Sequence, residues 1–511
     1  MPTFKDYTMA QLQLPLSFED FIPENHLVRV VNTVVECLDL KPLYDRYKEG
    51  GCPAYHPKMM LKVMIYSFSQ KTYSSRQIAK SLRENINFMW IAGGNKPDFR
   101  TINRFRLDMK DVIEDVFYEV VKLLIEKKYI KLQNYFLDGT KIEANANKYT
   151  FVWNKAVGNY DRKLDEKIKN HLREIDRIVA EENEIYLEDD LEETGVNSRI
   201  TTGQVEGVVK SIDKKLAKNP MDKKLKKKAK EFKKDILPRK QKYEEAFAIF
   251  EGRNSYSKTD HDATFMRMKE DAMLNGQLKP GYNVQIGTEN RYIVGFTIHP
   301  NPTDTKTMIP HLKHLEKRLG RLPENIVADA GYGSEENYEY LEEKNLGSYV
   351  KYNKFHWEKK KKNRENPYLT DNLPYIAETD RFVCRNGKQL LHIGNRKYVT
   401  EAGYETRRDY YRCEDCTGCP YATECKNTDK NRTIMVSHRL NELKRKANAN
   451  LCSKRGHKLR SQRVVEVEQV FGRIKGCWSF RRFHLRGADK VKIEWGLLAI
   501  AHNIAKMALE G

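Results

Sequence analysis

Apolar residues recur at helical spacing through the first quarter of the chain. In "HLVRVVNTVVECLDL" and "PKMMLKVMIYSF" they fall three and four residues apart, as on a helix with one buried face. Ser74 followed by Gln77 is typical of a helix capping box, and Asp98 is a suitable N-cap for the next helix. We therefore expect residues 1–130 to form a helical N-terminal domain.

The second of these capped helices carries polar and basic side chains. They are Arg100, Asn103, Arg104 and Arg106. Two short helices of which the second is basic fit a helix-turn-helix-like reader of DNA, so we predict that these residues contact DNA. The alternative is an ordinary helical pair with a charged surface.

The pattern then changes twice. "KLQNYFLDGTKIE" alternates like a strand that ends near Asp138. From about 155 to 250, "DEKIKNHLREIDRIVAEENE" and "MDKKLKKKAKEFKKDILPRKQKYEEAF" predict long charged helices that could pair as an antiparallel hairpin. The lysine-rich residues 223–234 fit a phosphate backbone and a solvated helix face equally well.

Strand and helix patterns alternate after residue 280. Residues 281–298 predict a hairpin with its turn at Gly287–Asn290, and a helix is expected from about residue 304 with Asp304 as its cap. A strand at 325–329, a helix in "SEENYEYLEE" and a strand in "GSYVKYN" follow. This order is typical of an α/β fold in which helices pack on the faces of a sheet.

We expect the sheet domain to be assembled from three separate parts of the chain. The parts are residues 131–150, 281–352 and 461–511, separated by a charged helical insertion at 151–280 and a basic, cysteine-rich insertion at 353–460. Two helices with apolar periodicity, near 463–476 and 489–509, close the chain.

The net charge of the chain indicates what kind of partner it binds. Lys plus Arg number 92 against 71 for Asp plus Glu, which gives a net charge of +21 in 511 residues. Such a surplus indicates a polyanionic partner, with nucleic acid first, although a merely basic soluble protein is the alternative. No apolar run is long enough to span a bilayer and no export signal is visible, so we expect a cytoplasmic protein without a membrane partner.

Two aspartates stand where α/β sheets place functional groups. Asp138 and Asp329 each come at the carboxyl end of an expected buried strand, followed by Gly or Ala-Gly. A half-buried carboxylate without a partner is costly, so the pair predicts a divalent cation, and carboxylate oxygens suit Mg²⁺ or Mn²⁺. For either residue alone, the alternative is a side chain that caps a turn or the next helix.

A third acidic ligand is expected on a helix. "VVEVEQVFGRIKG" places one apolar face on Val467, Val470, Phe471 and Ile474. Glu466 and Glu468 flank this face on opposite sides, and Arg473 and Lys475 respectively follow them by seven residues. Such pairs could hold a metal and a DNA phosphate together, or form two surface salt bridges. Helical geometry alone does not separate the two glutamates.

The cysteine spacing indicates a second metal site. Four of the nine cysteines form the run Cys413-x2-Cys416-x2-Cys419-x5-Cys425, which predicts tetrahedral Zn²⁺ that pins a loop-rich insertion without a core of its own. An iron–sulfur cluster and no metal at all are the alternatives, and Cys384 could replace one ligand.

Three segments also resemble a known family. "FLDGTKIEANANKYTFVW", "VADAGYGSEENY" and "VEVEQVFGRIKGCWSFRRFHLRGADKVKIEWGLLAIAHNIAK" are closely similar to DDE transposases of bacterial insertion sequences, and most similar to the group numbered eleven-eighty-two. The resemblance implies a ribonuclease-H-like core, a mixed sheet with flanking helices. "FIPENHLVRVVN" resembles the N-terminal domain of the same family.

The resemblance also implies which residues act. Asp138, Asp329 and Glu468 would form the triad, because the family's glutamate stands three residues before the Phe of "VFG" and seven before a Lys, which is Lys475 here. Related branches carry an Arg four residues before the glutamate. That position is Val464 in this chain, and the nearest arginine is Arg463.

The activity that this resemblance implies is DNA transposition. Mg²⁺ or Mn²⁺ ions at the triad would support hydrolysis at the element's end, after which the freed 3′-hydroxyl attacks target DNA. The partners would be double-stranded DNA, as terminal inverted repeats and as target, and a second copy of the chain in a homodimer at the bacterial nucleoid. A nuclease without strand transfer, and a descendant that only binds DNA, are the alternatives.

Overall fold

The structure is a computed structural model that describes residues 17–47, 54–182, 199–218, 220–268, 276–400 and 403–510. The chain divides into two compact units. One consists of residues 1–142, 283–485 and 489–511, and the other of residues 143–282 and 486–488. Each unit is formed by separate stretches of the chain, so neither is continuous in sequence.

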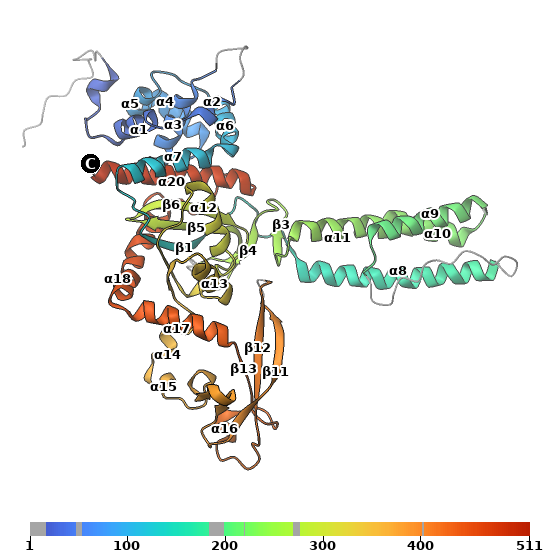
Figure 1. Cartoon of the computed structure of the whole chain (residues 1–511). Coiled ribbons are helices and arrows are strands. Elements are labelled where there is room, and N and C mark those ends of the chain that lie inside the picture. The colour runs from blue at the N-terminus through green and yellow to red at the C-terminus, as the bar shows by residue number, and fades with distance from the viewer. Residues whose placement is uncertain are drawn as a thin grey trace, which may run out of the picture. The chain divides into compact units, whose positions relative to one another are not determined.

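The N-terminal part of the first unit is helical, as the apolar periodicity predicts (Figure 1). Its helices are α1 (Leu27–Glu36), α2 (Lys41–Tyr44), α3 (Pro57–Ser69), α4 (Ser75–Glu84), α5 (Ile86–Ile91), α6 (Phe99–Asp108) and α7 (Ile113–Glu126). Asp98 caps α6 as predicted, since its carboxylate accepts the Thr101 N–H at 2.7 Å. The predicted capping box is wrong: Ser74 precedes α4 but makes no capping hydrogen bond, and it lines a surface hollow instead.

A mixed sheet forms the centre of the first unit (Figure 1). The sheet has six strands, and five of them are β1 (Asn134–Glu143), β5 (Leu278–Glu289), β6 (Tyr292–His299), β7 (Asn325–Ala328) and β8 (Gly347–Val350). They lie side by side in the order β6-β5-β1-β7-β8. The pairs β1–β7 and β7–β8 are parallel, whereas β5 and β6 form an antiparallel hairpin. The α/β prediction is confirmed at this level.

Helices pack against this sheet. They are α12 (Met308–Leu319), α13 (Glu335–Glu343), α17 (His438–Cys452), α18 (Lys454–Arg463) and α20 (Ala488–Glu510). Helix α20 is apolar enough to be buried from Ile493 to Lys506, and Gly496 lets it approach Ile113 of α7, since a Cβ there would lie 2.5 Å from the Ile113 side chain. Helices α12 and α7 contact β6, and α18 contacts β7 and β8.

The β5–β6 turn lies two residues later than predicted. Asn290 and Arg291 form it, with φ angles of 52° and 63°, and Glu289 is the last residue of β5. The Glu289 carboxylate is buried and accepts four backbone N–H groups, from Lys131, Leu132, Gln133 and Asn134, at 2.6–3.3 Å. One side chain therefore satisfies four consecutive backbone N–H groups in the segment that leads into β1.

Replacing Glu289 by Gln should lower the free energy of unfolding by about 3 kcal/mol, because an amide nitrogen cannot accept the N–H groups that one carboxylate oxygen now accepts. The measurement is urea unfolding followed by circular dichroism. Glu316→Gln is the matched control, since that half-exposed carboxylate only pairs with Lys344 at 2.9 Å, and its loss should cost less than about 1 kcal/mol. Equal midpoints for the two variants would contradict the role given to Glu289.

The cysteine-rich insertion has a sheet of its own. Its antiparallel strands are β9 (Tyr375–Ile376), β10 (Arg381–Val383), β11 (Gln389–Val399), β12 (Glu405–Cys413) and β13 (Thr433–Val436). Short helices α14 (Phe355–Glu358), α15 (Lys361–Arg364) and α16 (Ala422–Cys425) accompany it. Phe382, Leu390, Tyr411 and Ile434 are buried together, so the expectation of an insertion without a core is wrong.

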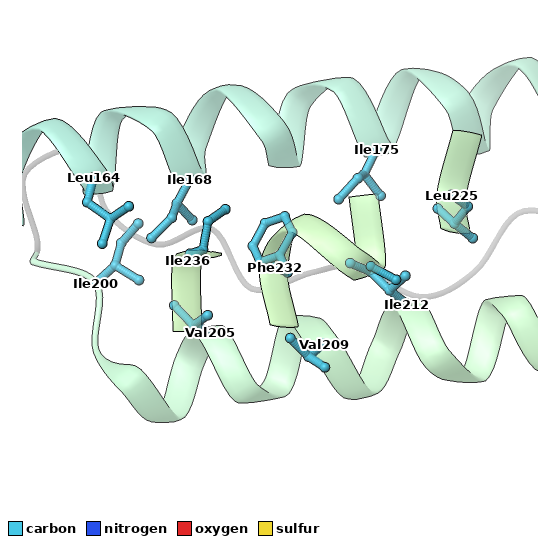
Figure 2. Close-up of a cluster of buried hydrophobic side chains, with 11 residues drawn as sticks. Leu164, Ile168, Ile175, Ile200, Val205, Val209, Ile212, Leu225, Phe232 and Ile236 are labelled. Carbon is cyan, nitrogen blue, oxygen red and sulfur yellow. The ribbon is translucent and has the colours of Figure 1, made fainter. Parts of the chain in front are cut away.

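The second unit consists mainly of helices. They are α8 (Asn154–Glu182), α9 (Thr202–Lys218), α10 (Lys223–Glu231) and α11 (Leu237–Phe250), with a π-helical segment Phe232–Ile236 between the last two. Figure 2 shows side chains of these segments pointing toward one another, among them Ile168, Val205 and Phe232. The two long helical regions are confirmed, but α9 was not predicted and makes the insertion more than a hairpin.

The helical unit also contains a buried group of charged side chains. Lys240 is fully buried, and its ammonium lies 2.7 Å from Asp161 and 2.5 Å from Asp165 of α8. The short strands β2 (Phe151–Trp153), β3 (Ser255–Ser257) and β4 (Thr264–Arg267) stand at the base of the helices, where β2 pairs with β3. The lysine-rich segment buries Leu225 and Ala229 and exposes most of its lysines.

Candidate active site

Asp138 lies in the middle of β1 and is almost completely buried, with 6% of its surface exposed. The prediction that this strand ends near Asp138 is wrong, because β1 continues to Glu143. Its Oδ1 accepts the N–H of Gly139 at 2.9 Å, and its Oδ2 lies 3.2 Å from the guanidinium of Arg463. The Arg463 side chain, which is 12% exposed, thus faces the carboxylate and would offset much of the cost of burying a charge there.

Asp329 follows β7 and comes level with Asp138. The parallel register pairs Phe136 with Val327, and the same register carried two residues further brings the two aspartates side by side. Because side chains alternate along a strand, both point to the same face of the sheet. Asp329 Oδ1 also accepts the Gly331 N–H at 2.8 Å, which fixes the turn that follows.

Asp304 is a third carboxylate near Asp138 and Asp329, and the sequence-based prediction of its role is wrong. We expected it to cap a helix, but α12 begins at Met308 and Thr307 occupies the N-cap position. Instead, Asp304 Oδ1 accepts hydrogen bonds from the side-chain amides of Asn283 and Gln285, both at 2.8 Å. The polar residues before the helix, "NPTDTKT", were the only signal in the sequence.

Two glycines show how closely the three carboxylates approach. A Cβ on Gly139 would lie 2.6 Å from Asp304 Oδ1, and a Cβ on Gly331 would lie 3.0 Å from Asp329 Oδ1 and 3.5 Å from Asp304 Oδ2. Position 139 within β1 and position 331 after β7 therefore both need glycine next to Asp304. Tyr332, which is buried, donates to Gln285 and so ties the second turn to the same amide.

The helix with the two glutamates lies along β1. It runs without interruption from α18 through a π-helical segment (Val464–Glu468), α19 (Gln469–Phe471) and a second π-helical segment (Gly472–Cys477). Arg463 contacts Asp138, and the Lys475 ammonium donates to the carbonyl oxygen of Lys141 at 3.0 Å. Glu468 lies between these two contacts.

The structure separates Glu466 from Glu468. The Glu466 carboxylate accepts the Arg291 N–H at 2.5 Å, in the β5–β6 turn, and burial raises the pKa of Glu466. Glu468 is exposed. Glu466 thus binds the backbone of the β5–β6 hairpin, whereas the exposed side chain of Glu468 is accessible to a ligand.

Arg473 and Lys475 lie on different sides of this helix. Lys475 is buried against β1, as described. Arg473 stacks over the Trp478 ring at 5.3 Å and lines a pocket of about 310 Å³ together with His502 and Lys506. Burial lowers the pKa of Arg473 and lowers that of His502 to about 3. The predicted pair of DNA-contacting cations is therefore not presented on one surface.

Comparison with known families supports the resemblance to transposases. Residues 383–508 match a family model described as a transposase DDE domain, and residues 16–108 match one described as a transposase domain (DUF772). Both matched domains are transposase domains. The resemblance to insertion-sequence transposases is confirmed, while membership of the eleven-eighty-two group stays a prediction. No curated protein and no solved structure gives a match.

The N-terminal helical domain carries a hollow of about 610 Å³ between α4 and α6. Arg76, Arg100, Asn103 and Arg104 line it, and the guanidinium groups of Arg76 and Arg100 lie 5.2 and 5.8 Å from the Phe99 ring. Arg106 differs from the other predicted DNA contacts. It is buried and donates to the Tyr73 carbonyl and to Asn103, so its role in this structure is to hold α6 in place.

The four predicted zinc ligands lie around the end of β12 in the DDE-domain match. Cys413 is buried, and burial together with Cys416 and Cys384 raises its pKa to about 12. Arg432 donates to Cys416 and Cys425, the latter at 3.0 Å. In the described part of the chain no group of three or more His, Cys, Asp or Glu side chains is arranged to hold a metal ion, so the zinc prediction gains no support.

Membrane insertion finds no support either. Across the described ranges, every helix is too short or too polar to pass through a bilayer.

Proposed function

We propose that this transposase cleaves the ends of an insertion sequence and joins them to target DNA, with Asp138, Asp329 and Glu468 as its catalytic triad. The observation that carries the proposal is the level placement of Asp138 and Asp329 on adjacent parallel strands, with the helix of Glu468 fastened along β1. Side chains on a rigid sheet keep their positions better than side chains on loops.

The order of strands supports a ribonuclease-H-like core. Counted along the chain, the strands β1, β5, β6, β7 and β8 are first to fifth, and across the sheet they stand third, second, first, fourth and fifth. An antiparallel hairpin followed by parallel strands in this order is the arrangement that the resemblance implies, and it places the first and fourth strands side by side.

A π-helix supports Glu468 as the third member. Related branches carry an Arg four residues before the glutamate, whereas Arg463 stands five residues before Glu468. Residues Val464–Glu468 are π-helical, and residues five apart in a π-helix are neighbours much as residues four apart are in an α-helix. The wider π-helical turn therefore accommodates the extra residue, and Arg463 and Glu468 lie on the same side of the helix.

The donor types of the proposed triad suit a hard divalent cation, although among the described residues no three acidic side chains are arranged around a metal site. Asp138 and Asp329 offer carboxylate oxygens on one face of the sheet, and Glu468 is exposed on the adjacent helix. We propose that these three residues hold Mg²⁺ or Mn²⁺. When bound, such ions activate an attacking oxygen and stabilise the leaving oxygen in an in-line displacement at phosphorus.

The other residues of the site position these ligands. Arg463 holds the Asp138 carboxylate, and Asn283 and Gln285 orient Asp304. In the first step a water oxygen bonds to phosphorus, the bond to the 3′-oxygen breaks, and a 3′-hydroxyl is released. In the second step this hydroxyl bonds to a target phosphorus, and the 3′-oxygen of the target strand leaves. No covalent bond to the enzyme forms in either step.

The test of this function is a reaction of the purified protein with a plasmid that carries the inverted repeats flanking its gene, in Mg²⁺. We expect cuts at the repeat ends, and joined products when a second plasmid is added. Cuts without joined products from pre-cleaved ends would favour a nuclease, and binding without cuts would favour a DNA-binding descendant.

Gly139→Ala should lower the rate of end cleavage by about 100-fold, although no carboxylate is removed. The added Cβ would lie 2.3 Å from Gln285 and 2.6 Å from Asp304, so both side chains must move, and displacements near 1 Å are costly for catalysis. Gly207→Ala is the matched control, since nothing lies within 4 Å of the added atom there. Single-turnover rates compare the two. Equal rates would show that the space around Asp304 is unimportant.

We further propose that Arg100, Asn103 and Arg104 contact the DNA ends from the N-terminal hollow. Arg104→Ala should weaken binding of an end duplex, and the slope of log affinity against log salt should fall by about one, as expected for one lost phosphate contact. Lys122→Ala, which removes an exposed charge on α7, should leave the slope unchanged. Identical slopes for both variants would show that Arg104 does not contact DNA and that the DNA-binding surface lies elsewhere.

A further inference from the structure

Lys351 occupies a third position level with the two aspartates. It follows β8 directly, and its N–H donates to the Ala328 carbonyl at 3.3 Å. The parallel register pairs Ala328 with Val350, so the next residues, Asp329 and Lys351, are neighbours at the carboxyl ends of β7 and β8. Gly333 confirms the closeness of the two turns, because a Cβ there would lie 2.4 Å from the Lys351 carbonyl oxygen.

Two arginines of α18 add to this cation. Helix α18 contacts both β7 and β8, and Arg460 and Arg463 are close enough to act on Lys351. Arg463 is occupied by Asp138, while Arg460 donates to His457 and lies 5.1 Å from the Phe355 ring.

Asp329 is the carboxylate that acts on Lys351, and the two arginines oppose it. In the part of the chain that the structure describes, Lys351 makes no ion pair with a carboxylate, although it is half-buried between cations. A half-buried ammonium that two arginines repel is costly for the free protein, and an anion at this place would remove the cost. A phosphodiester satisfies it well, since its oxygens accept the donors that Lys and Arg present.

We propose that Lys351, assisted by Arg460, binds the DNA phosphate next to the one that is cut, and so positions the strand against Asp329. This inference rests on the proposed function, because it places the DNA at the triad. It makes Lys351 a substrate-positioning residue, distinct from Lys475, which is already occupied by the Lys141 carbonyl.

The test combines protein variants with chemically neutralised phosphates. Lys351→Ala, Lys351→Arg and the control Lys317→Ala, an exposed lysine of α12, are compared on end duplexes in which a methylphosphonate replaces one phosphate at a time near the cut. Binding is measured by fluorescence anisotropy in Ca²⁺, and single-turnover cleavage in Mg²⁺. Thermal unfolding of each variant checks that it is folded.

We expect Lys351→Ala to lower the cleavage rate of the unmodified duplex by about 30-fold, Lys351→Arg to retain most of it, and Lys317→Ala to match the wild type. At one position the methylphosphonate should weaken wild-type binding about tenfold and leave Lys351→Ala unaffected, because the contact is already lost. The inference is overturned if every methylphosphonate weakens both proteins equally, or if Lys351→Ala cuts like Lys317→Ala. A wild type that neither binds nor cuts end DNA would instead overturn the proposed function.

Discussion

Asp329→Asn should abolish cleavage of end DNA, with a fall of at least about 10³-fold in the single-turnover rate. An amide has the shape of the carboxylate but no charge, and it is a far weaker ligand for Mg²⁺. Asp329 makes its one side-chain hydrogen bond with the Gly331 N–H, which an amide oxygen can still accept. The variant should therefore fold and bind end DNA like the wild type.

Asp138→Asn should have the same effect on cleavage, with a loss of stability in addition. Arg463 would keep its charge beside a neutral amide, and breaking one partner of a buried ion pair is typically destabilising by about 3 kcal/mol. Asp371→Asn is the control for both, since that aspartate is exposed and its nearest cation, Lys354, is 3.8 Å away. If either Asn variant cuts at more than a tenth of the wild-type rate, the two aspartates are not both ligands.

Glu468→Gln and Glu466→Gln should differ by more than about 100-fold in cleavage rate, although the two residues are two positions apart on one helix. Glu468 is the exposed glutamate on the Arg463 side, and its loss removes a metal ligand. Glu466 is half-buried and accepts the Arg291 N–H, which a glutamine oxygen can also accept. Because burial already raises the pKa of Glu466, a neutral amide is tolerated there.

Single-turnover cleavage in Mg²⁺, with thermal unfolding beside it, distinguishes the two glutamates. The expected pattern is a folded, inactive Glu468→Gln and an active Glu466→Gln. The reverse pattern would assign the third ligand to Glu466 and would mean that the helix turns by half a revolution when DNA binds.

Much of the central fold could be predicted from local pattern. The strands at 134–143 and 325–328 both begin as apolar runs, and the second ends directly before Asp329 as predicted, whereas the first continues past Asp138 to Glu143. Asp98 was identified as a cap because capping depends on residues three positions apart. Both features are local, and the structure contains both.

What could not be predicted depends on contacts between distant segments. Asp304 was assigned to a helix start because its sequence neighbours suit that role, but the amides of Asn283 and Gln285, some twenty residues earlier, bind it. The same holds for Lys351, whose relation to Asp329 exists only through the pairing of β7 with β8.

The π-helical turn and the second sheet were missed for related reasons. No residue in "VVEVE" signals an inserted residue, because the contacts at both ends of the helix impose it. Strands β11 and β12 carry many charged and exposed residues, so the alternation that reveals a half-buried strand is weak there. Buried Tyr411 and Ile434, which form its core, come from separate strands.

The central claim is that Asp138, Asp329 and Glu468 share divalent cations. The most direct measurement is anomalous diffraction from crystals of the protein with end DNA and Mn²⁺. The account predicts anomalous peaks within about 2.0–2.5 Å of carboxylate oxygens of all three residues. Peaks that involve Glu466 in place of Glu468, or Mn²⁺ bound away from Asp138 and Asp329 in crystals whose DNA is cut, would contradict it.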